Sequence, residues 1–395
     1  MEENAKKDGR RGIWNFLQLV SRLFIAPGYG YSCEQLTLDA PFLLVSNHVT
    51  DLDPFFVGMA CKKTPLTFVA SEHIARMGVV SKIIMKLLSP IPRAKAASGA
   101  STVKSCLRRI RAGEAIALFA EGDCTWDGLT AHIFPATGKL AKASGAPLVT
   151  FRLTGGHLIN PRWAFKRRRG NMRGAAVRVY TAEELRSMTA DEITEAIERD
   201  IAENAWERQR REMIPLRSRR AAEGLERAVC VCPECGAVAS LASKNGEVFC
   251  KNEGCGFEAS VDGFGFFKGE EPFPTVAEWD EWQKARLKEY LARGERVNDL
   301  EGEVRGRFTK LSGEETRGKY ENASARLDFK SRSVIINGAA IGLSEIDNMS
   351  MVRANRLLFS TKDGYYELKC KSGCLRKFLL VWQAADGLEK GNTVL

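Results

Sequence analysis

The sequence predicts an α/β protein with two smaller modules behind its main domain, and three observations support that prediction. Strand-like and helix-like segments alternate over residues 40–185, which is typical of a sheet layered with helices. Two short cysteine pairs lie between residues 230 and 255. From about residue 301, short strands alternate with Gly, Asn, Asp and Ser, and an amphipathic segment, "LRKFLLVWQAA", follows. This last pattern indicates a small antiparallel β domain with a C-terminal helix.

The composition allows a substantial core and more than one domain. The chain has 395 residues, 44% of them hydrophobic, and a net charge of +10 from 59 Lys and Arg against 49 Asp and Glu. This surplus favours anionic partners such as phosphorylated substrates, anionic membrane surfaces or nucleic acid, although a solvated basic surface explains it equally well. No charge-free apolar segment reaches the roughly 20 residues that span a bilayer, and no convincing secretory signal is present. We therefore expect a protein in the cytosol or on the cytosolic face of a membrane, with thiols reduced or metal-bound.

Residues 11–26 predict a short helix with an apolar face that includes Trp14, Phe16 and Phe24. Basic residues lie at or just before its start, namely Lys6, Lys7, Arg10 and Arg11. An apolar face with a basic lead-in suits a helix in the membrane interface. An ordinary amphipathic helix packed on its own domain has the same pattern. We expect residues 1–28 to form a basic amphipathic helix at an anionic membrane surface.

The elements of the main domain, residues 29–227, follow in order. Strands are expected at "FLLVSN", "LTFVAS", "EAIALFAEG" and "APLVTFRLTGG". Helices are expected at "PFFVGMA", "SKIIMKLL", "ASTVKSCLRRIRAG" and "GKLAKASG". The segment "TADEITEAIERDIAENAWERQRREM" predicts one long helix, with Thr189 and Glu192 as its capping box.

The stretch "LLVSNHVTDLDPFFVG", residues 43–58, places His48 between an apolar run and a predicted helix start. A neutral imidazole can take a proton from a hydroxyl near pH 7, and a carboxylate on its other nitrogen fixes the tautomer. Asp53 is five residues further on, so the two side chains meet only if the chain turns, which Pro54 favours. The alternative is structural, because Asp53-Pro54 also suits a helix N-cap and a lone His near a strand end is often not catalytic.

Later segments place further polar residues beside predicted strands. "SPIPRAKAASG" puts Arg93 and Lys95 in a loop before a helix. "ALFAEGDCTWDG" puts Glu121 and Gly122 just past an apolar strand, where α/β sheets usually hold their ligand-contacting loops. Each signal alone is weak, whereas their order and spacing together are specific.

With these blocks the sequence resembles the glycerolipid acyltransferase family, which includes the bacterial lysophosphatidic acid acyltransferases, over about residues 12–185. The family's first block is Asn-His, four residues, then Asp-Pro. Its second block ends in an Arg, its third usually reads Phe-Pro-Glu-Gly-Thr-Arg-Ser, and its fourth is an Ala-Pro pair opening a strand. The matching positions here are Asn47, His48, Asp53 and Pro54, then Arg93, then "FAEGDCT" at 119–125, then Ala146 and Pro147.

The resemblance implies direct acyl transfer in phospholipid biosynthesis or remodelling, without an acyl-enzyme and without a catalytic metal. His48 would deprotonate the hydroxyl of a lysophospholipid such as lysophosphatidic acid, which would attack the thioester of acyl-CoA or acyl-carrier protein. Asp53 would orient His48, and Arg93 would hold an acceptor phosphate. The residues expected to bind substrate are Asn47, Arg93, Glu121, Gly122, Asp123 and Thr125. The basic N-terminal helix and the basic run "KRRRG" at 166–170 are expected to contact anionic lipid. With no secretory signal and no spanning segment, we expect a peripheral, monotopic protein at the cytoplasmic face of the cell membrane.

The third block departs from the family pattern at two positions. The family's Arg is here Cys124, and its Thr or Asn is Asp123. A thiol cannot replace the bidentate fork of Arg toward phosphate, and Asp123 adds a negative charge nearby. A different acceptor, or a catalytically impaired lipid-binding or scaffold protein that keeps the fold, is therefore the alternative. Arg152 and Lys139 could supply compensating charge.

The segment "CVCPECGAVASLASKNGEVFCKNEGCGF" contains Cys232-x2-Cys235 and Cys250-x4-Cys255. Asn245-Gly246 between the pairs predicts a hairpin turn. This spacing suits a zinc ribbon over residues 228–268 in which four thiolates hold a structural Zn²⁺ and leave no open position. Unliganded buried thiols are the alternative, and Cys230 has no assigned role. Zinc ribbons often bind nucleic acid, but no aromatic stacking set flanks this one, so nucleic acid is not expected as a partner.

A linker helix is expected within residues 269–299, at "TVAEWDEWQKARLKEYLARG". The strands expected after it are "EVRGRFTKL", "ARLDFK", "SVIIN", "NRLLFST" and "YYELKC". With the closing helix, residues 300–395 weakly resemble a pleckstrin-homology-like fold. Such folds often bind phospholipids or proteins.

Overall fold

The computed structural model describes residues 2–71, 89–93, 100–269, 272–294, 304–311, 320–371 and 373–387. The helix expected at 81–88 and Lys95 lie outside these ranges. The chain divides into two compact units. Within the described ranges, residues 2–161 and 169–214 belong to the first, and residues 162–168 and 215–387 to the second.

The first unit is built on a seven-stranded sheet in the order β1-β7-β6-β2-β5-β3-β4. Its strands are β1 Ser32–Cys33, β2 Leu43–Ser46, β3 Leu66–Ser71, β4 Ile91–Arg93, β5 Ala115–Phe119, β6 Leu148–Thr154 and β7 Arg173–Tyr180. All neighbouring pairs are parallel except β6 and β7. The α/β sheet expected from the alternating pattern is therefore confirmed.

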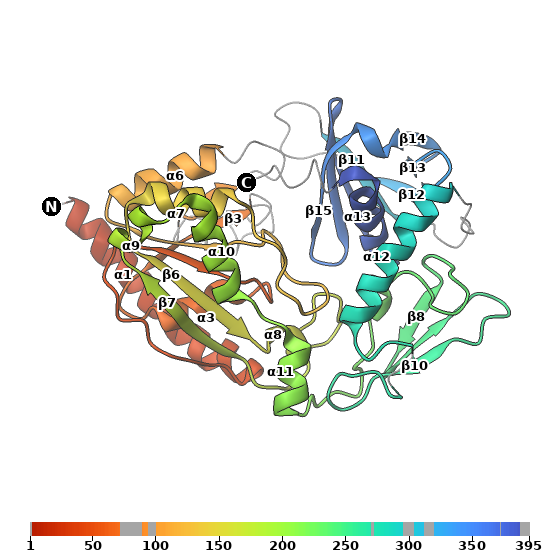
Figure 1. Ribbon diagram of the computed structural model, residues 1–395, viewed down its shortest axis with the longest axis horizontal. Helices are drawn as coiled ribbons and strands as arrows, with labels where there is room; N and C mark the ends of the chain where they lie inside the picture. The colour runs from red at the N-terminus through yellow and green to blue at the C-terminus, as the bar shows by residue number, and fades with distance from the viewer. Residues whose placement is uncertain are drawn as a thin grey trace. The chain divides into compact units, whose positions relative to one another are not determined.

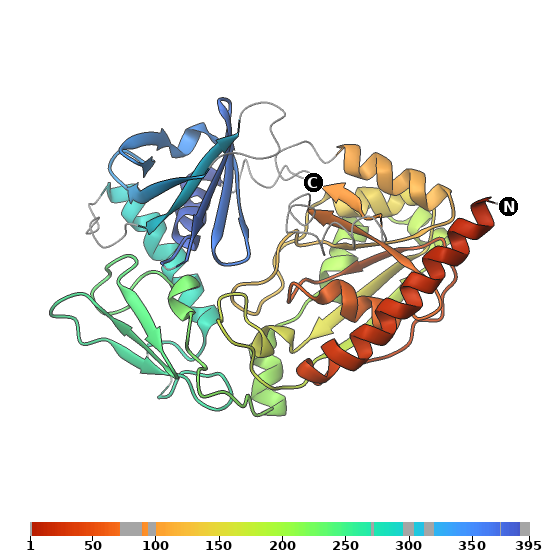
Figure 2. The same ribbon diagram turned by 180° about the vertical axis from the view of Figure 1, so that it is seen from behind.

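Helices cover both faces of this sheet, which explains why its central strands are continuous apolar runs. They are α1 Glu2–Val20, α2 Ala26–Tyr29, α3 Asp53–Ala60, α6 Ala100–Arg111, α7 Ala136–Ser144, α8 Gly156–Ile159, α9 Ala182–Ser187, α10 Ala190–Ile201 and α11 Ala205–Glu212. One core layer contains Trp14 and Phe56 from α1 and α3, and the other contains residues of α6, α7, α9 and α10. Figure 1 shows α6, α7, α9 and α10 on one side of the sheet, and Figure 2 shows α1 on the other.

The N-terminal helix is longer than expected, because α1, a π-helical turn at Ser21–Ile25 and α2 follow one another without a break from residue 2 to 29. Its buried face packs on α3: the indole N–H of Trp14 donates to the carbonyl of Cys61, and the amide of Gln18 donates to the carbonyl of Gly58. Its exposed side includes four large apolar side chains, those of Phe16, Leu19, Leu23 and Phe24.

The single long helix expected at 189–213 is wrong. Thr189 and Glu192 do form a capping box at the start of α10, but the helix ends at Ile201. Asn204 then caps a second helix, α11, by accepting from the backbone N–H groups of Trp206 and Glu207. The break arises because the backbone at 203–205 bonds to residues 128–130 instead of continuing the helix, a tertiary preference that no local pattern reveals.

The second unit contains a three-stranded antiparallel sheet and a seven-stranded antiparallel sheet. The small sheet has β8 Leu241–Lys244, β9 Glu247–Cys250 and β10 Glu258–Ser260, and Asn245 and Gly246 make the expected turn between β8 and β9. A helix, α12 Val276–Arg293, follows. The large sheet has β11 Val304–Leu311, β12 Glu321–Asp328, β13 Ser333–Ile336, β14 Ala339–Gly342, β15 Ile346–Val352, β16 Arg356–Thr361 and β17 Gly364–Cys370.

The strands of the large sheet lie in the order β14-β13-β12-β11-β17-β16-β15. The closing helix, α13 Arg376–Trp382, follows the last strand. The expected β-rich C-terminal region with its helix is therefore confirmed. The strands β14 and β15 were not expected. The pleckstrin-homology-like assignment stays a prediction. Among the described residues, no helix combines the length and the hydropathy needed to cross a bilayer.

Candidate active site

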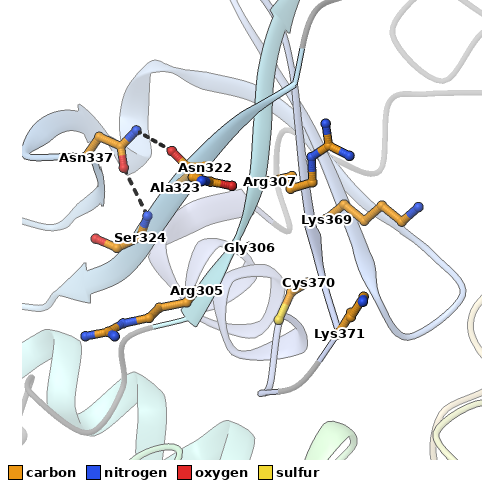
Figure 3. Close-up of a pocket in the computed structure, with 10 residues that line it drawn as sticks. All are labelled: Arg305, Gly306, Arg307, Asn322, Ala323, Ser324, Asn337, Lys369, Cys370 and Lys371. Atoms are coloured by element: carbon orange, nitrogen blue, oxygen red, sulfur yellow. Dashed lines mark hydrogen bonds between the residues drawn. The ribbon is translucent and has the colours of Figure 1, made fainter.

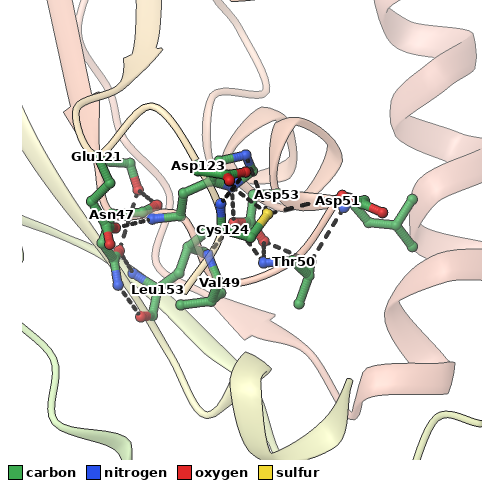
Figure 4. A network of polar contacts seen from close by, with 12 residues as sticks. Asn47, Val49, Thr50, Asp51, Asp53, Glu121, Asp123, Cys124 and Leu153 are labelled. Carbon is green, nitrogen blue, oxygen red and sulfur yellow. Dashed lines mark hydrogen bonds and ion pairs between the residues drawn. The ribbon is translucent and has the colours of Figure 1, made fainter. Parts of the chain in front are cut away.

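The polar residues singled out in the first unit meet at one edge of its sheet. Strand β2 ends at Ser46 and its parallel neighbour β5 ends at Phe119, in register with one another. His48 and Glu121 therefore follow the carboxyl ends of adjacent strands, where open α/β sheets hold their ligands. The backbone N–H of Thr125 donates to the carbonyl of His48, which joins the two loops. Figure 4 shows the Asn47 side chain beside the backbone of Leu153, and Asp53 beside Thr50.

His48 and Asp53 form a direct pair, with His48 Nδ1 2.8 Å from Asp53 Oδ2. The Asp53 side chain is fully buried, whereas 19% of the His48 side chain is exposed. The same carboxylate accepts from the backbone N–H of Val49 at 2.6 Å and from the hydroxyl of Thr50 at 2.7 Å. The chain turns between the two residues, because the N–H of Asp53 donates to the carbonyl of Thr50.

The structural alternative for Asp53, a helix N-cap, is wrong. The N-cap position of α3 is Leu52, and Asp53 is the first residue of the helix. Its carboxylate bonds backward to the loop before the helix, not forward to the free N–H groups of the first turn. Pro54, at the second helical position, has no N–H to satisfy and fits the start of the helix. Asp53 therefore holds the His48 loop.

The pairing fixes the tautomer of the neutral His48 ring. A carboxylate only accepts hydrogen bonds, so the proton of the neutral imidazole lies on Nδ1 and the lone pair on Nε2. A partly exposed imidazole with its lone pair free at Nε2 can take a proton from a hydroxyl brought against it.

Both faces of the His48 ring are covered. The Phe119 ring stacks on it with centroids 4.3 Å apart and an interplanar angle of 18°. The sulfur of Cys124 lies 3.4 Å from Nε2 and 3.5 Å from Nδ1. Nearly equal distances to both nitrogens place the sulfur over the ring face and off the in-plane direction of the Nε2 lone pair. The thiol therefore confines the imidazole without sharing a proton with Nε2.

Glu121 and Asn47 hold the backbone around His48 in place through hydrogen bonds to main-chain groups. Glu121 Oε1 accepts from the backbone N–H of His48 at 2.6 Å, and Oε2 accepts from that of Ala131 at 2.7 Å. Burial raises the pKa of Glu121 to about 8, against the effect of these two N–H donors. Asn47 is fully buried, and its amide makes two 2.8 Å hydrogen bonds with the backbone of Leu153 on β6. Both side chains position the His48 loop.

The other expected substrate-binding residues lie in the loop after β5 or beside it. Arg93, at the end of β4, packs over Gly122, where a Cβ would lie 2.9 Å from the guanidinium, and the positive φ of 72° also favours glycine. Burial lowers the pKa of Arg93, and the charge of Asp123 acts in the opposite direction. The structure thus brings Arg93, Gly122 and Asp123 together, with an acidic group beside the cation.

Three further residues have local roles in the structure. The hydroxyl of Thr125 donates to Asp127 and accepts from the N–H of Gly128, so it shapes its own loop. Arg152 donates to the carbonyl of Ala202. Lys139 is exposed on α7.

The four expected metal ligands also converge, in the second unit. The sulfur atoms of Cys232, Cys235, Cys250 and Cys255 all lie within 4.8 Å of one another. Two of the S–S separations are 3.7 and 3.8 Å. Zinc–thiolate bonds of about 2.3 Å in a tetrahedron put the sulfurs about 3.8 Å apart, so the four thiols fit Zn²⁺. Cys230 lies outside this group and contacts the Cys374 thiol, which raises the pKa of Cys230.

Comparison with known proteins bears on the first unit. A family model described as Acyltransferase matches residues 31–154. These residues include His48, Asp53 and the loop after β5. Over residues 31–154 the chain is therefore similar to the acyltransferase family.

A solved structure also resembles part of the chain. It is the 1-acyl-sn-glycerophosphate (LPA) acyltransferase PlsC from Thermotoga maritima, with 18% sequence identity over 50% of this chain and 82% of that chain, and a TM-score of 0.40. A likeness of this degree carries no argument about function. Among curated proteins, no match was found.

The acyltransferase domain contains two features that the motifs did not reveal. Phe119 and Cys124 were quoted within the third block, but neither was expected to enclose His48. Thr50 was not singled out, although both its hydroxyl and its N–H bond to Asp53. The signal for Thr50 is its place in the turn between His48 and Asp53, where a hydroxyl residue can reach a nearby carboxylate.

Proposed function

We propose that this protein is a peripheral acyltransferase that moves a fatty acyl group from acyl-CoA or acyl-carrier protein to a hydroxyl of a lysophospholipid. The observation that carries the proposal is the pairing of a partly exposed His48 with a fully buried Asp53 in a domain of the acyltransferase family.

The reaction follows from the chemistry of that pair. Nε2 of His48 takes the proton of the acceptor hydroxyl while its oxygen attacks the thioester carbonyl, and Asp53 stabilises the imidazolium that forms. The tetrahedral intermediate collapses, the C–S bond breaks, and the leaving thiolate receives the proton from His48. The products are the ester and a free thiol. These steps need neither an acyl-enzyme nor a catalytic metal.

The acceptor is proposed from the residues beside His48. Arg93 supplies a cation next to the loop after β5, and a lysophospholipid phosphate such as that of lysophosphatidic acid would pair with it. Asp123 reduces the positive charge there, and Cys124 adds none. A head group less anionic than a phosphomonoester fits this balance of charge as a second acceptor class.

Membrane attachment is proposed through the N-terminal helix. Phe16, Leu19, Leu23 and Phe24 are 63%, 55%, 59% and 76% exposed, while Gln18 and Ser21 are buried. This is the reverse of an ordinary surface helix, whose solvent face is polar. Arg11 and Arg22 lie exposed on the same helix and suit anionic head groups. On this proposal the protein is peripheral and monotopic, and it lies on the cytoplasmic face of the membrane.

The four-cysteine cluster completes the proposal as a structural Zn²⁺ site. Cys232, Cys235, Cys250 and Cys255 would hold the ion, and with all four positions filled by thiolates it would stabilise the fold of residues 228–268.

The test is release of free thiol from acyl-CoA by the purified protein on anionic vesicles, with lysophosphatidic acid and other lyso-lipids as acceptors. His48→Ala is the key variant, and His132→Ala, with a side chain 68% exposed, is its matched control. Transfer that disappears only in His48→Ala supports the proposal, and the preferred lyso-lipid identifies the acceptor. Absence of His48-dependent transfer with acyl-CoA and with acyl-carrier protein would overturn it.

The second candidate is a lipid-binding or scaffold protein that keeps the fold without turnover. The observation that favours it is the sulfur of Cys124 over the His48 ring, at the position where the family has Arg. This candidate predicts saturable lyso-lipid binding with no thiol release.

A further inference from the structure

A basic pocket lies in the second unit, on the strands β11, β12 and β17. Its volume is about 640 Å³. Four of its ten lining residues are cationic and none is acidic; the cations are Arg305, Arg307, Lys369 and Lys371. Figure 3 shows them around the opening, with Asn337 on the opposite side from Lys369. No residue of this pocket belongs to the acyltransferase domain or to the cysteine cluster.

The strand register places these cations opposite one another. β11 lies between β12 and β17, and Arg307 is paired directly with Lys369. Gly306 pairs with Cys370, so continuing the antiparallel register by one residue sets Arg305 opposite Lys371. All four cationic side chains are exposed. Like charges directly opposite on neighbouring strands destabilise a sheet, so a bound anion would relieve the repulsion between these cations.

Among the residues that the structure describes, no carboxylate supplies such an anion to three of the four cations. Within the described ranges, Arg307, Lys369 and Lys371 form no ion pair. The carboxylate of Glu367, two residues before Lys369, is buried, bonds to Arg356 at 3.0 Å and accepts from the hydroxyl of Tyr320. The Arg307 guanidinium lies over the Tyr320 ring, 5.4 Å from its centroid. A cation–π contact of this kind holds a guanidinium in place without neutralising it.

The walls of the pocket are fixed by backbone contacts. A Cβ at Gly306 would clash with the carbonyl oxygen of Lys369, so glycine permits the close approach of β11 to β17 at this point. On the other side, the Asn337 amide donates to the carbonyl of Asn322 and accepts from the N–H of Ser324. These contacts fix the two strands and the Asn337 side chain that form part of the pocket's lining.

We infer that this pocket binds a phosphate-bearing group with more than one negative charge. Arg and Lys are the side chains that recognise phosphate oxygens. The volume lies in the range of about 300–1,000 Å³ of small-molecule sites, larger than a single inorganic ion requires. An anionic phospholipid head group and a soluble phosphate ester share this chemistry.

The test uses the full chain and two double variants that each remove two positive charges. Arg307→Gln with Lys369→Gln alters the pocket, and Lys330→Gln with Lys362→Gln alters two exposed turn lysines of the same sheet. Binding is measured to vesicles of phosphatidylcholine with and without phosphatidic acid, and by calorimetry to inorganic pyrophosphate and sn-glycerol 3-phosphate. The vesicle arm is run with Phe16→Ser and Leu23→Ser also present, so that the N-terminal helix does not mask the result.

The pocket variant is expected to weaken binding at least about tenfold, since each charge near an anionic surface contributes roughly one factor of five. If the pocket variant binds both the vesicles and the soluble phosphates more weakly, the inference is supported with a soluble phosphate ester as the ligand. If its binding is weaker only to vesicles that contain phosphatidic acid, the inference is supported with a lipid head group as the ligand. Equal effects of the two double variants, no binding to either class of probe, or a pocket-dependent affinity for RNA alone would overturn it.

Discussion

Asp53 Oδ2 lies 2.8 Å from Nδ1 of His48, across a turn in which the carboxylate also accepts from the backbone of Val49 and Thr50. One side chain thus fixes both the tautomer of the imidazole and the path of the loop that carries it. The two roles can be separated by mutation.

Asp53→Asn keeps one acceptor oxygen for the loop but removes the carboxylate that stabilises the imidazolium. We expect thiol release to fall by about 10²–10⁴-fold, because the imidazole loses the carboxylate that fixes its tautomer and stabilises its protonated form. The measurement is kcat with saturating acyl donor, together with Tm. Asp39→Asn, at an exposed position of the same unit, is the control. Full activity in Asp53→Asn would show that Asp53 is not needed to orient or stabilise the His48 imidazole.

Cys124→Ser tests whether the thiol takes part in acyl transfer. Because its sulfur lies over the ring face, we expect kcat to change by less than about tenfold, whereas loss of a true nucleophile costs several orders of magnitude. Mass spectrometry of the protein quenched during turnover is expected to show no acyl group on Cys124. An acylated Cys124 peptide would contradict direct transfer.

Phe16→Ser with Leu23→Ser is expected to weaken vesicle binding at least about tenfold, because burying each apolar side chain contributes about 1.5–3 kcal/mol. Vesicle co-sedimentation measures this. Val177→Ser with Val179→Ser on β7 is the matched control, since these valines are 40% and 39% exposed on the same unit. If both double variants bind vesicles as the unaltered protein does, the N-terminal helix is not the attachment site.

Cys235→Ser removes one of four proposed metal ligands. The purified protein is expected to contain one zinc per chain by elemental analysis, and the variant to lose it and to unfold at a lower temperature, because binding of a structural zinc contributes to folding. Cys33→Ser, far from the cluster in sequence, is expected to retain the metal. A zinc-free protein whose Tm is unchanged by Cys235→Ser and by a chelator would refute the site.

Arg376→Met tests a buried ion pair of the second unit. Two guanidinium nitrogens contact the fully buried carboxylate of Asp280 at 2.6 and 2.9 Å, and Lys284 lies 2.6 Å from it. Loss of Arg376 leaves the half-exposed Lys284 as the remaining cation beside this buried carboxylate, and is expected to cost up to about 3–5 kcal/mol of unfolding free energy. The exposed pair Arg286 and Glu289 gives the control, Arg286→Met, expected to cost less than about 1 kcal/mol. An equal loss of Tm in both variants would contradict this.

The same pair sets a pH dependence. Burial alone would raise the pKa of Asp280, but the charges of Arg376 and Lys284 outweigh it and hold that pKa well below its usual range. A carboxyl whose pKa is lower in the folded than in the unfolded state stabilises the fold fully at pH values above its unfolded pKa of about 3.9. This stabilisation is lost as the pH falls from there toward the pKa of the folded state. Unfolding free energies of the unaltered protein and Arg376→Met are therefore expected to converge below about pH 4.

Local sequence patterns were enough to predict most of the main elements and the residue types of the candidate site. Apolar runs broken by turn residues gave the main strands, the Thr189 capping box gave the start of α10, and the spacing of the cysteines gave the cluster. The blocks around His48, Arg93 and Glu121 also placed three polar groups after strand ends. These features are local, because periodicity, capping and short spacing depend on neighbours in the chain.

Only the tertiary structure decided what each of these groups does. It showed that Asp53 holds the His48 loop and does not cap α3, and that Asn47 and Glu121 bond to backbone groups. It ended α10 at Ile201, and it aligned Arg307 with Lys369 across two strands. Hydrogen-bond partners distant in sequence and the register of paired strands are set by packing of the whole domain, and no local pattern contains them.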